Sequence, residues 1–189
     1  MSEFDLSVGA SYEDRRRALC ASHLRDLGLS GEVSSLGLQA QEPVKLITLL
    51  NIATVGCFLD YVAESAGRPT GELMDDPAFA NLPYWQDSLW APLDFTPAKA
   101  FEDDSDGPFF FGSSPRLLAA LNHIKTISRI PLGPAPSQYE VMISDPRTFY
   151  KTFDRLADEQ SCIQWVWRGL HDAATLALQK RVPMLGNGL

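Results

Sequence analysis

The stretch from Gly71 to Phe110 most constrains how this chain can fold, because five prolines interrupt it within forty residues. Proline removes a backbone donor and clashes with the preceding helical turn, so no long helix can run through this stretch. It also contains eight of the nineteen aromatic residues of the chain, and an irregular segment must bury such rings to stay ordered. We therefore expect an irregular crossing segment, held down by its rings, between helical regions on either side.

The same segment carries the whole excess of negative charge. It has nine acidic residues and one basic residue, Lys99, so its formal charge is −8, equal to that of the complete chain. The other fifteen acidic and fifteen basic residues cancel. A charge of −8 argues against nucleic acid and against anionic membrane surfaces as partners, because both are polyanions. It favours a basic partner.

Helical periodicity dominates outside this segment, where apolar residues recur at three- and four-residue spacing. The expected helices span about residues 11–27, 43–65, 115–128, 146–156 and 159–181. The 43–65 helix is apolar nearly all round and should be central, together with the 159–181 helix. We therefore expect a mainly α, all-α fold: a single-domain bundle of about five helices over residues 1–189, with flexible termini at 1–10 and 184–189.

Local signals add detail to this helical scheme. Ser114 is the expected N-cap of the 115–128 helix, with Pro115 as its first helical residue. A small β element is expected at most, from short strands at Leu93–Phe95 and Phe109–Phe111 and an edge strand at 139–143. Trp167 is expected in the core and Trp165 at its boundary, because they lie two residues apart on one helix.

Three cysteines, Cys20, Cys57 and Cys162, are far apart and odd in number, which fits a reducing compartment better than a disulfide framework. The first residues have neither the basic start nor the apolar core of a signal peptide, so we expect a cytoplasmic location. The most apolar run, residues 44–59, is too short and too polar to span a bilayer, so no membrane association is expected.

No catalytic or metal-binding motif is complete. The acidic run 102–107 matches the first half of a calcium loop but places Ser113 where the closing glutamate is required. Cys20 and His23 form half of a zinc pattern, and His23 is expected to be a satisfied core or interfacial histidine. His171 and Asp172 are helix neighbours, expected to point in different directions rather than form a dyad. We predict no metal, no cofactor and no catalytic residue.

We expect the Gly71–Phe110 segment to meet a protein partner. Interfaces favour aromatic side chains at their centre with charge around them, although the same rings would also pin the segment onto the helices. Crowded carboxylates repel one another, and a basic partner relieves that repulsion. The residues expected to contact a basic protein partner are Asp75, Asp76, Tyr84, Trp85, Asp87, Trp90, Asp94, Glu102, Asp103, Asp104 and Asp106.

In size, acidity, absence of an export signal and absence of a catalytic motif, the chain resembles the small acidic cytoplasmic immunity proteins that bacteria use against their own toxins. The resemblance implies a non-enzymatic binding module that neutralises a basic toxin sterically and electrostatically. Two alternatives stay open: a helical enzyme or small-molecule-binding protein with an interhelical pocket, and an acidic chaperone or adaptor for a secreted protein. The expected lining of such a pocket is Thr48, Asn51, Thr54, Phe58 and Trp167, with His23 or His171.

Overall fold

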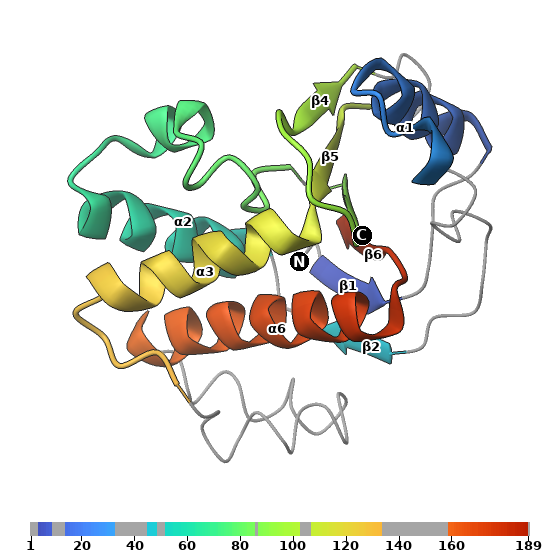
Figure 1. Cartoon of the computed structure of the whole chain (residues 1–189). Helices are drawn as coiled ribbons and strands as arrows, with labels where there is room; N and C mark the ends of the chain where they lie inside the picture. Colours follow the sequence, from blue (N-terminus) through green and yellow to red (C-terminus); the bar gives the residue numbers. More distant parts are fainter. Residues whose placement is uncertain are drawn as a thin grey trace.

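A computed structural model of the chain describes residues 4–8, 14–32, 45–48, 52–85, 87–102, 107–133 and 159–188 (Figure 1). Its strands are β1 (Phe4–Val8), β2 (Lys45–Thr48), β3 (Asp87–Ala91), β4 (Lys99–Phe101), β5 (Phe109–Ser113) and β6 (Met184–Gly188). Its helices are α1 (Asp14–Asp26), α2 (Ile52–Ala66), α3 (Ser114–Ile127) and α6 (Glu159–Lys180), with short 3₁₀ turns η1 (Ser30–Glu32) and η2 (Thr70–Asp75).

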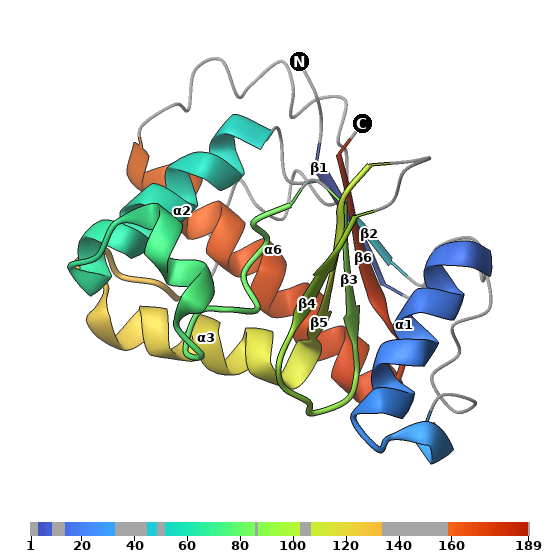
Figure 2. The same cartoon turned by 90° about the horizontal axis from the view of Figure 1, so that it is seen from above.

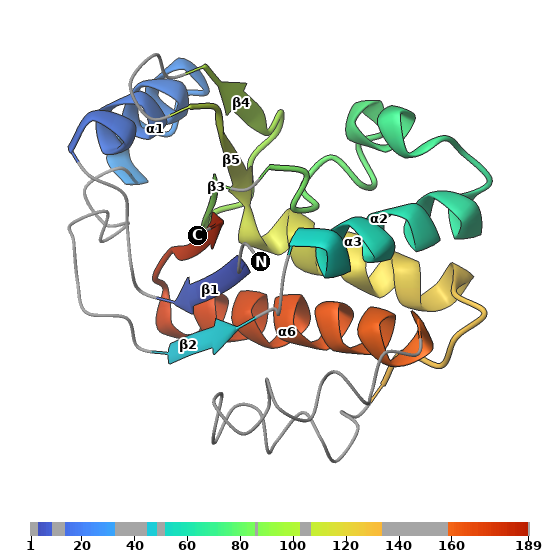
Figure 3. The same ribbon diagram turned by 180° about the vertical axis from the view of Figure 1, so that it is seen from behind.

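The six strands form one mixed sheet in the order β2-β1-β6-β3-β5-β4. β3 and β5 are parallel, and every other neighbouring pair is antiparallel. Helices α2, α3 and α6 cover one face of the sheet, and α1 lies against the other (Figure 2). Seen from behind, β1 and β2 run beside α6, which packs against both (Figure 3).

Each face of the central strands is buried in its own core. Trp90 and Phe110 enter the core under α2, α3 and α6, whereas Phe109, Phe111 and Leu89 enter the core under α1. This assignment follows from the two-residue repeat of a strand, which sends successive side chains to opposite faces. The run Phe109-Phe110-Phe111 is therefore fully buried because its sheet is covered on both sides.

The expected mainly α bundle is wrong: the protein has an α/β fold built on the six-stranded sheet. The all-α expectation was wrong because strands that are buried on both faces have continuous apolar sequences. Such sequences lack the alternation of polar and apolar residues by which a strand is recognised. It also failed at the ends of the chain, where flexible termini were expected. Residues 4–8 form β1, and residues 184–188 form β6, an inner strand paired with both β1 and β3.

The expected helix at 43–65 divides into strand β2 and helix α2, which begins only at Ile52. A short apolar run does not distinguish a buried strand from a buried helix by periodicity, and Ile47 and Thr48 are β-branched. Of the expected strands, Phe109–Phe111 is confirmed within β5, whereas Leu93–Phe95 forms no strand and lies in the connection between β3 and β4. The helix at 146–156 and the strand at 139–143 lie outside the described residues.

The other expected helices are confirmed as α1, α3 and α6, with bounds within a few residues of those expected. The N-cap of α3 is Ser113 rather than Ser114, because the Ser113 hydroxyl accepts a hydrogen bond from the Arg116 backbone N–H at 3.3 Å. Within the described ranges, no helix has the length and apolar character that a membrane-spanning helix needs.

We predict that Gly112→Ala destabilises the protein by roughly 1–3 kcal/mol, because overpacking displaces buried neighbours. A Cβ at Gly112 would lie 2.6 Å from Phe110 Cε1 and 2.9 Å from both Asn81 Oδ1 and Trp90 Cδ1. The measurement is the free energy of unfolding in urea. Gly56→Ala in α2 is the matched control: its Cβ meets nothing within 4 Å, so it should stabilise the helix by about 0.5–1 kcal/mol. Equal effects of the two substitutions would contradict the close packing at Gly112.

Candidate functional site

The exposed side of η2 is the strongest candidate for a functional surface. Leu73 is fully buried and fixes η2 onto the core, and the Thr70 hydroxyl donates a 2.8 Å hydrogen bond to Asp60 of α2. The remaining residues of this turn face solvent. We call the exposed set the η2 surface; it consists of Gly71, Glu72, Met74 and Asp75.

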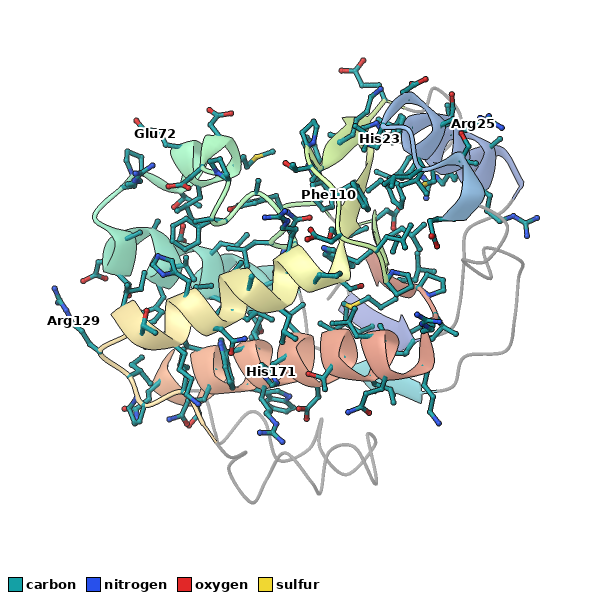
Figure 4. The ribbon with its side chains drawn as sticks, viewed as in Figure 1. His23, Arg25, Glu72, Phe110, Arg129 and His171 are labelled. Carbon is teal, nitrogen blue, oxygen red and sulfur yellow. The ribbon has the colours of Figure 1, made fainter. Side chains whose placement is uncertain are left out.

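The geometry of a 3₁₀ turn arranges this surface. With three residues per turn, Glu72 and Asp75 lie above one another on one edge, while Met74 occupies the next edge. Met74 is 38% exposed, and among the described residues no other large apolar side chain is exposed. Glu72 projects away from the body of the protein (Figure 4). The result is an apolar side chain on the edge next to two stacked carboxylates.

Asp76, which follows η2, belongs to the structure of the turn. Its Oδ2 lies 2.7 Å from Arg68 Nη1, and its Oδ1 accepts a hydrogen bond from the Ala78 backbone N–H at 2.9 Å. In contrast, the ion pairs of the described residues include neither Glu72 nor Asp75. The charge of Asp76 is therefore largely neutralised within the chain, and the charges of Glu72 and Asp75 are not.

Asp87 and Asp94 are also paired with arginines of the chain. Arg16, on the buried side of α1, places its Nη1 3.2 Å from Asp87 Oδ2 and its guanidinium 5.1 Å from the Phe109 ring centre. Asp94 accepts a 2.5 Å hydrogen bond from Arg116 Nε, in a pair whose two side chains are both largely exposed. The first pair fastens α1 to the sheet, and the second joins the turn after β3 to the first turn of α3.

The three expected anchor rings pack inward. Trp90 is fully buried, and its indole N–H donates a 2.8 Å hydrogen bond to the Asn81 carbonyl. The Tyr84 hydroxyl donates to the Phe79 carbonyl at 3.1 Å, and burial together with the charge of Asp76 raises the pKa of Tyr84. Trp85 is half-buried against the same core. The rings therefore hold the segment onto the helices. The sequence was compatible with this packing role as well as with contact to a partner.

The remaining expected contact residues divide into two groups. Glu102 is exposed just after β4. Asp103, Asp104 and Asp106 lie outside the described residues, and so does most of the calcium-like run. Sequence reasoning missed Glu72 and Met74. A signal for Glu72 was present, because Glu72 and Asp75 are three residues apart, the spacing that places two side chains on one edge of a 3₁₀ turn.

The interhelical pocket of the rival hypothesis is not assembled as expected. Phe58 and Trp167 are packed in the main core, with less than 3% of each exposed, and the Trp167 indole N–H donates to the Leu121 carbonyl at 2.8 Å. Thr54 is buried on α2, but Thr48 belongs to β2 and so does not share a helix face with it. Asn51 lies outside the described residues. Trp165, expected at the boundary, is buried with Trp167.

His23 is a satisfied core histidine, as expected. Its Nε2 donates a 3.0 Å hydrogen bond to the Pro97 carbonyl, and the rings of Phe95, Phe101 and Phe111 surround it at about 6 Å. Cys20, one turn earlier on α1, is buried in the same core, and this burial raises the pKa of its thiol. A thiol held neutral by burial is a poor nucleophile and a poor metal ligand.

His171 lies closer to Asp172 than the sequence suggested, with 3.7 Å between His171 Nδ1 and Asp172 Oδ1. That distance exceeds a hydrogen bond, and Asp172 instead accepts a 2.8 Å hydrogen bond from Arg168 Nε. The His171 ring stacks on Trp167 with 4.8 Å between ring centres. Within the described ranges, no group of three or more potential metal-ligating side chains comes together.

Comparison with protein-family models, with curated protein sequences and with solved structures gave no match to this chain.

We predict that Asp87→Asn destabilises the protein by roughly 1–3 kcal/mol, because it removes the charge of a largely buried ion pair between α1 and β3. Asp94→Asn is the matched control: it removes the same charge from an exposed pair and should cost less than about 1 kcal/mol. Urea unfolding of the two variants makes the comparison. A larger loss for Asp94→Asn would show that Asp87 does not fasten α1 as described.

His171 should make the stability of the protein depend on pH. Burial lowers the pKa of His171, and neighbouring Asp172 opposes this effect only in part. Because the folded pKa lies below the unfolded value of about 6.5, the unfolded chain binds the proton first, and stability is lost as the pH falls below that value. His171→Phe keeps a ring against Trp167 but cannot be protonated. Thermal melts between about pH 7.5 and pH 5 should show a smaller loss of Tm for the variant than for wild type. Parallel pH profiles would contradict this role of His171.

Proposed function

We propose that this chain is a non-enzymatic protein-binding module that neutralises a basic protein partner, in the manner of an immunity protein acting on a bacterial toxin. The η2 surface is the proposed contact. The observation that carries the proposal is an exposed methionine, Met74, beside two carboxylates, Glu72 and Asp75, that no ion pair of the described chain neutralises.

The two kinds of side chain have different roles in this proposal. Carboxylates at the tip of a projecting turn attract a cationic surface over several ångströms and so raise the rate of encounter. The flexible, polarisable side chain of methionine adapts to irregular apolar sockets, which suits it to contact after encounter. Glu72 and Asp75 therefore steer the partner, and Met74 anchors it.

The apolar anchor is Met74 rather than Trp90, because Trp90 is fully buried. A substitution at Trp90 would open a cavity in the core and change stability before it changed binding. Met74 can be truncated without that complication, because its neighbour Leu73 makes the buried contact that holds η2 in place.

The test starts from a pull-down in the native host at low and high salt, followed by binding kinetics with the basic protein that is captured. We predict that Asp75→Lys lowers the association rate constant by about tenfold at low salt and flattens its salt dependence, because a steering charge is reversed. Met74→Ala should mainly raise the dissociation rate constant, because it removes the anchor.

Asp26→Lys is the matched control, since Asp26 is exposed on α1 at the opposite face of the sheet and the change in net charge is the same. Expression of the captured partner in bacteria, with and without this chain, then tests neutralisation directly. Wild-type kinetics for both Asp75→Lys and Met74→Ala would exclude the η2 surface as the contact.

A further inference from the structure

Met74 and Met184 differ sharply in their access to solvent. The chain has four methionines, and these two lie among the described residues. Met74 is 38% exposed on η2, whereas Met184 is fully buried at the start of β6, which lies inside the sheet between β1 and β3. A small solute therefore reaches the Met74 side chain without any opening of the fold, but it reaches Met184 only when the sheet opens.

The contacts that hold η2 in place come from its other residues. Leu73 is fully buried, and the Thr70 hydroxyl donates a 2.8 Å hydrogen bond to Asp60 of α2. A chemical change at the Met74 side chain therefore alters the η2 surface while the turn stays folded. The same change at Met184 would place a polar group in the core and destabilise the protein.

We propose that Met74 is a site of reversible oxidation by hydrogen peroxide and that its sulfoxide releases the partner bound at the η2 surface. The inference rests on the proposed function, in which Met74 is the apolar anchor. In the oxidation step, a lone pair of the thioether sulfur attacks one peroxide oxygen. The S–O bond forms as the O–O bond breaks, and the other oxygen leaves as water after proton transfer. Sulfur is oxidised by two electrons, and the peroxide is reduced.

The sulfoxide lacks the properties that make methionine an anchor. Oxidation converts a flexible apolar side chain into a polar one, whose oxygen loses its hydrogen bonds to water when it enters an apolar socket. Methionine sulfoxide reductases restore the thioether: two thiols become a disulfide, and the sulfoxide oxygen leaves as water. Because η2 is exposed, the sulfoxide is accessible to such an enzyme, and the change can be reversed.

The charges beside Met74 favour a neutral oxidant. Glu72 and Asp75 belong to the same turn, and no ion pair of the described residues neutralises them. Their negative charges repel anionic oxidants such as peroxynitrite, whereas hydrogen peroxide is uncharged and is not repelled. The proposed oxidant is therefore hydrogen peroxide.

The first test uses the purified full chain without a partner. The chain is treated with hydrogen peroxide, and the sulfoxide at each methionine is followed over time by mass spectrometry of its peptides. Met74 should be oxidised at least about tenfold faster than Met184, because Met184 reacts only after the sheet opens. In urea, where the chain is unfolded, the two rates should be equal. Equal rates in the folded protein would overturn the proposal.

The second test measures the dissociation rate constant of the basic protein captured in the pull-down. Oxidation of the wild-type chain should raise this constant at least about fivefold, and a methionine sulfoxide reductase with its thiol should restore it. Met74→Leu keeps an apolar side chain of similar volume, so peroxide should leave its dissociation unchanged. This variant also controls for oxidation at Met1 and Met142, which lie outside the described residues.

Met74→Ala separates the oxidation switch from the proposed contact. If this variant dissociates at the wild-type rate, Met74 is not the anchor, and the contact of the proposed function is wrong. If Met74→Ala dissociates faster than wild type but oxidised wild type does not, Met74 anchors the partner without being a switch. The oxidation switch alone is also overturned if peroxide affects Met74→Leu as strongly as wild type.

Discussion

The parallel pairing of β3 with β5 is the interaction on which the other parts of the structure depend. It brings the apolar runs of both strands together, so that one set of side chains enters the core under the three large helices and the other enters the core under α1. It also fixes the start of α3: the Ser113 backbone N–H donates to Asn81 Oδ1, and the Ser114 hydroxyl donates to the Trp90 carbonyl. Both helical layers are therefore positioned from this pair of strands.

The acidic segment has two uses that the charge count alone could not separate. Some of its carboxylates are part of the architecture: Arg16, Arg68 and Arg116, all from outside the segment, pair with its aspartates and fasten it to α1, to the end of α2 and to α3. Others, in η2, stay exposed on a turn that a buried leucine holds in place. The net charge of a segment thus says little about which of its carboxylates are available to a partner.

Local sequence rules predicted the elements whose signals are local. The amphipathic pattern of residues 159–180, its basic C-terminal turn and the following Pro183 specify α6 without reference to the rest of the chain. The sheet is different because β1, β2 and β6 are short, and β6 contains two glycines. Their conformation is fixed by neighbours far along the sequence, and no propensity reveals such neighbours. The candidate site was predicted in part: Asp75 was named, whereas Glu72 and Met74 were not, because their exposure depends on which side of η2 packs onto α2.

The place of β6 has a consequence for how the sheet forms. This strand follows every other described element along the chain, yet it lies between β1 and β3 and pairs with both. During synthesis, β1 and β3 therefore each have one edge of unpaired backbone groups until residues 184–188 have left the ribosome. Contacts of such long sequence separation close slowly. Loss of residues 184–188 would remove the strand that joins the β2-β1 pair to the β3-β5-β4 group and would leave one edge of β1 and one edge of β3 without a partner.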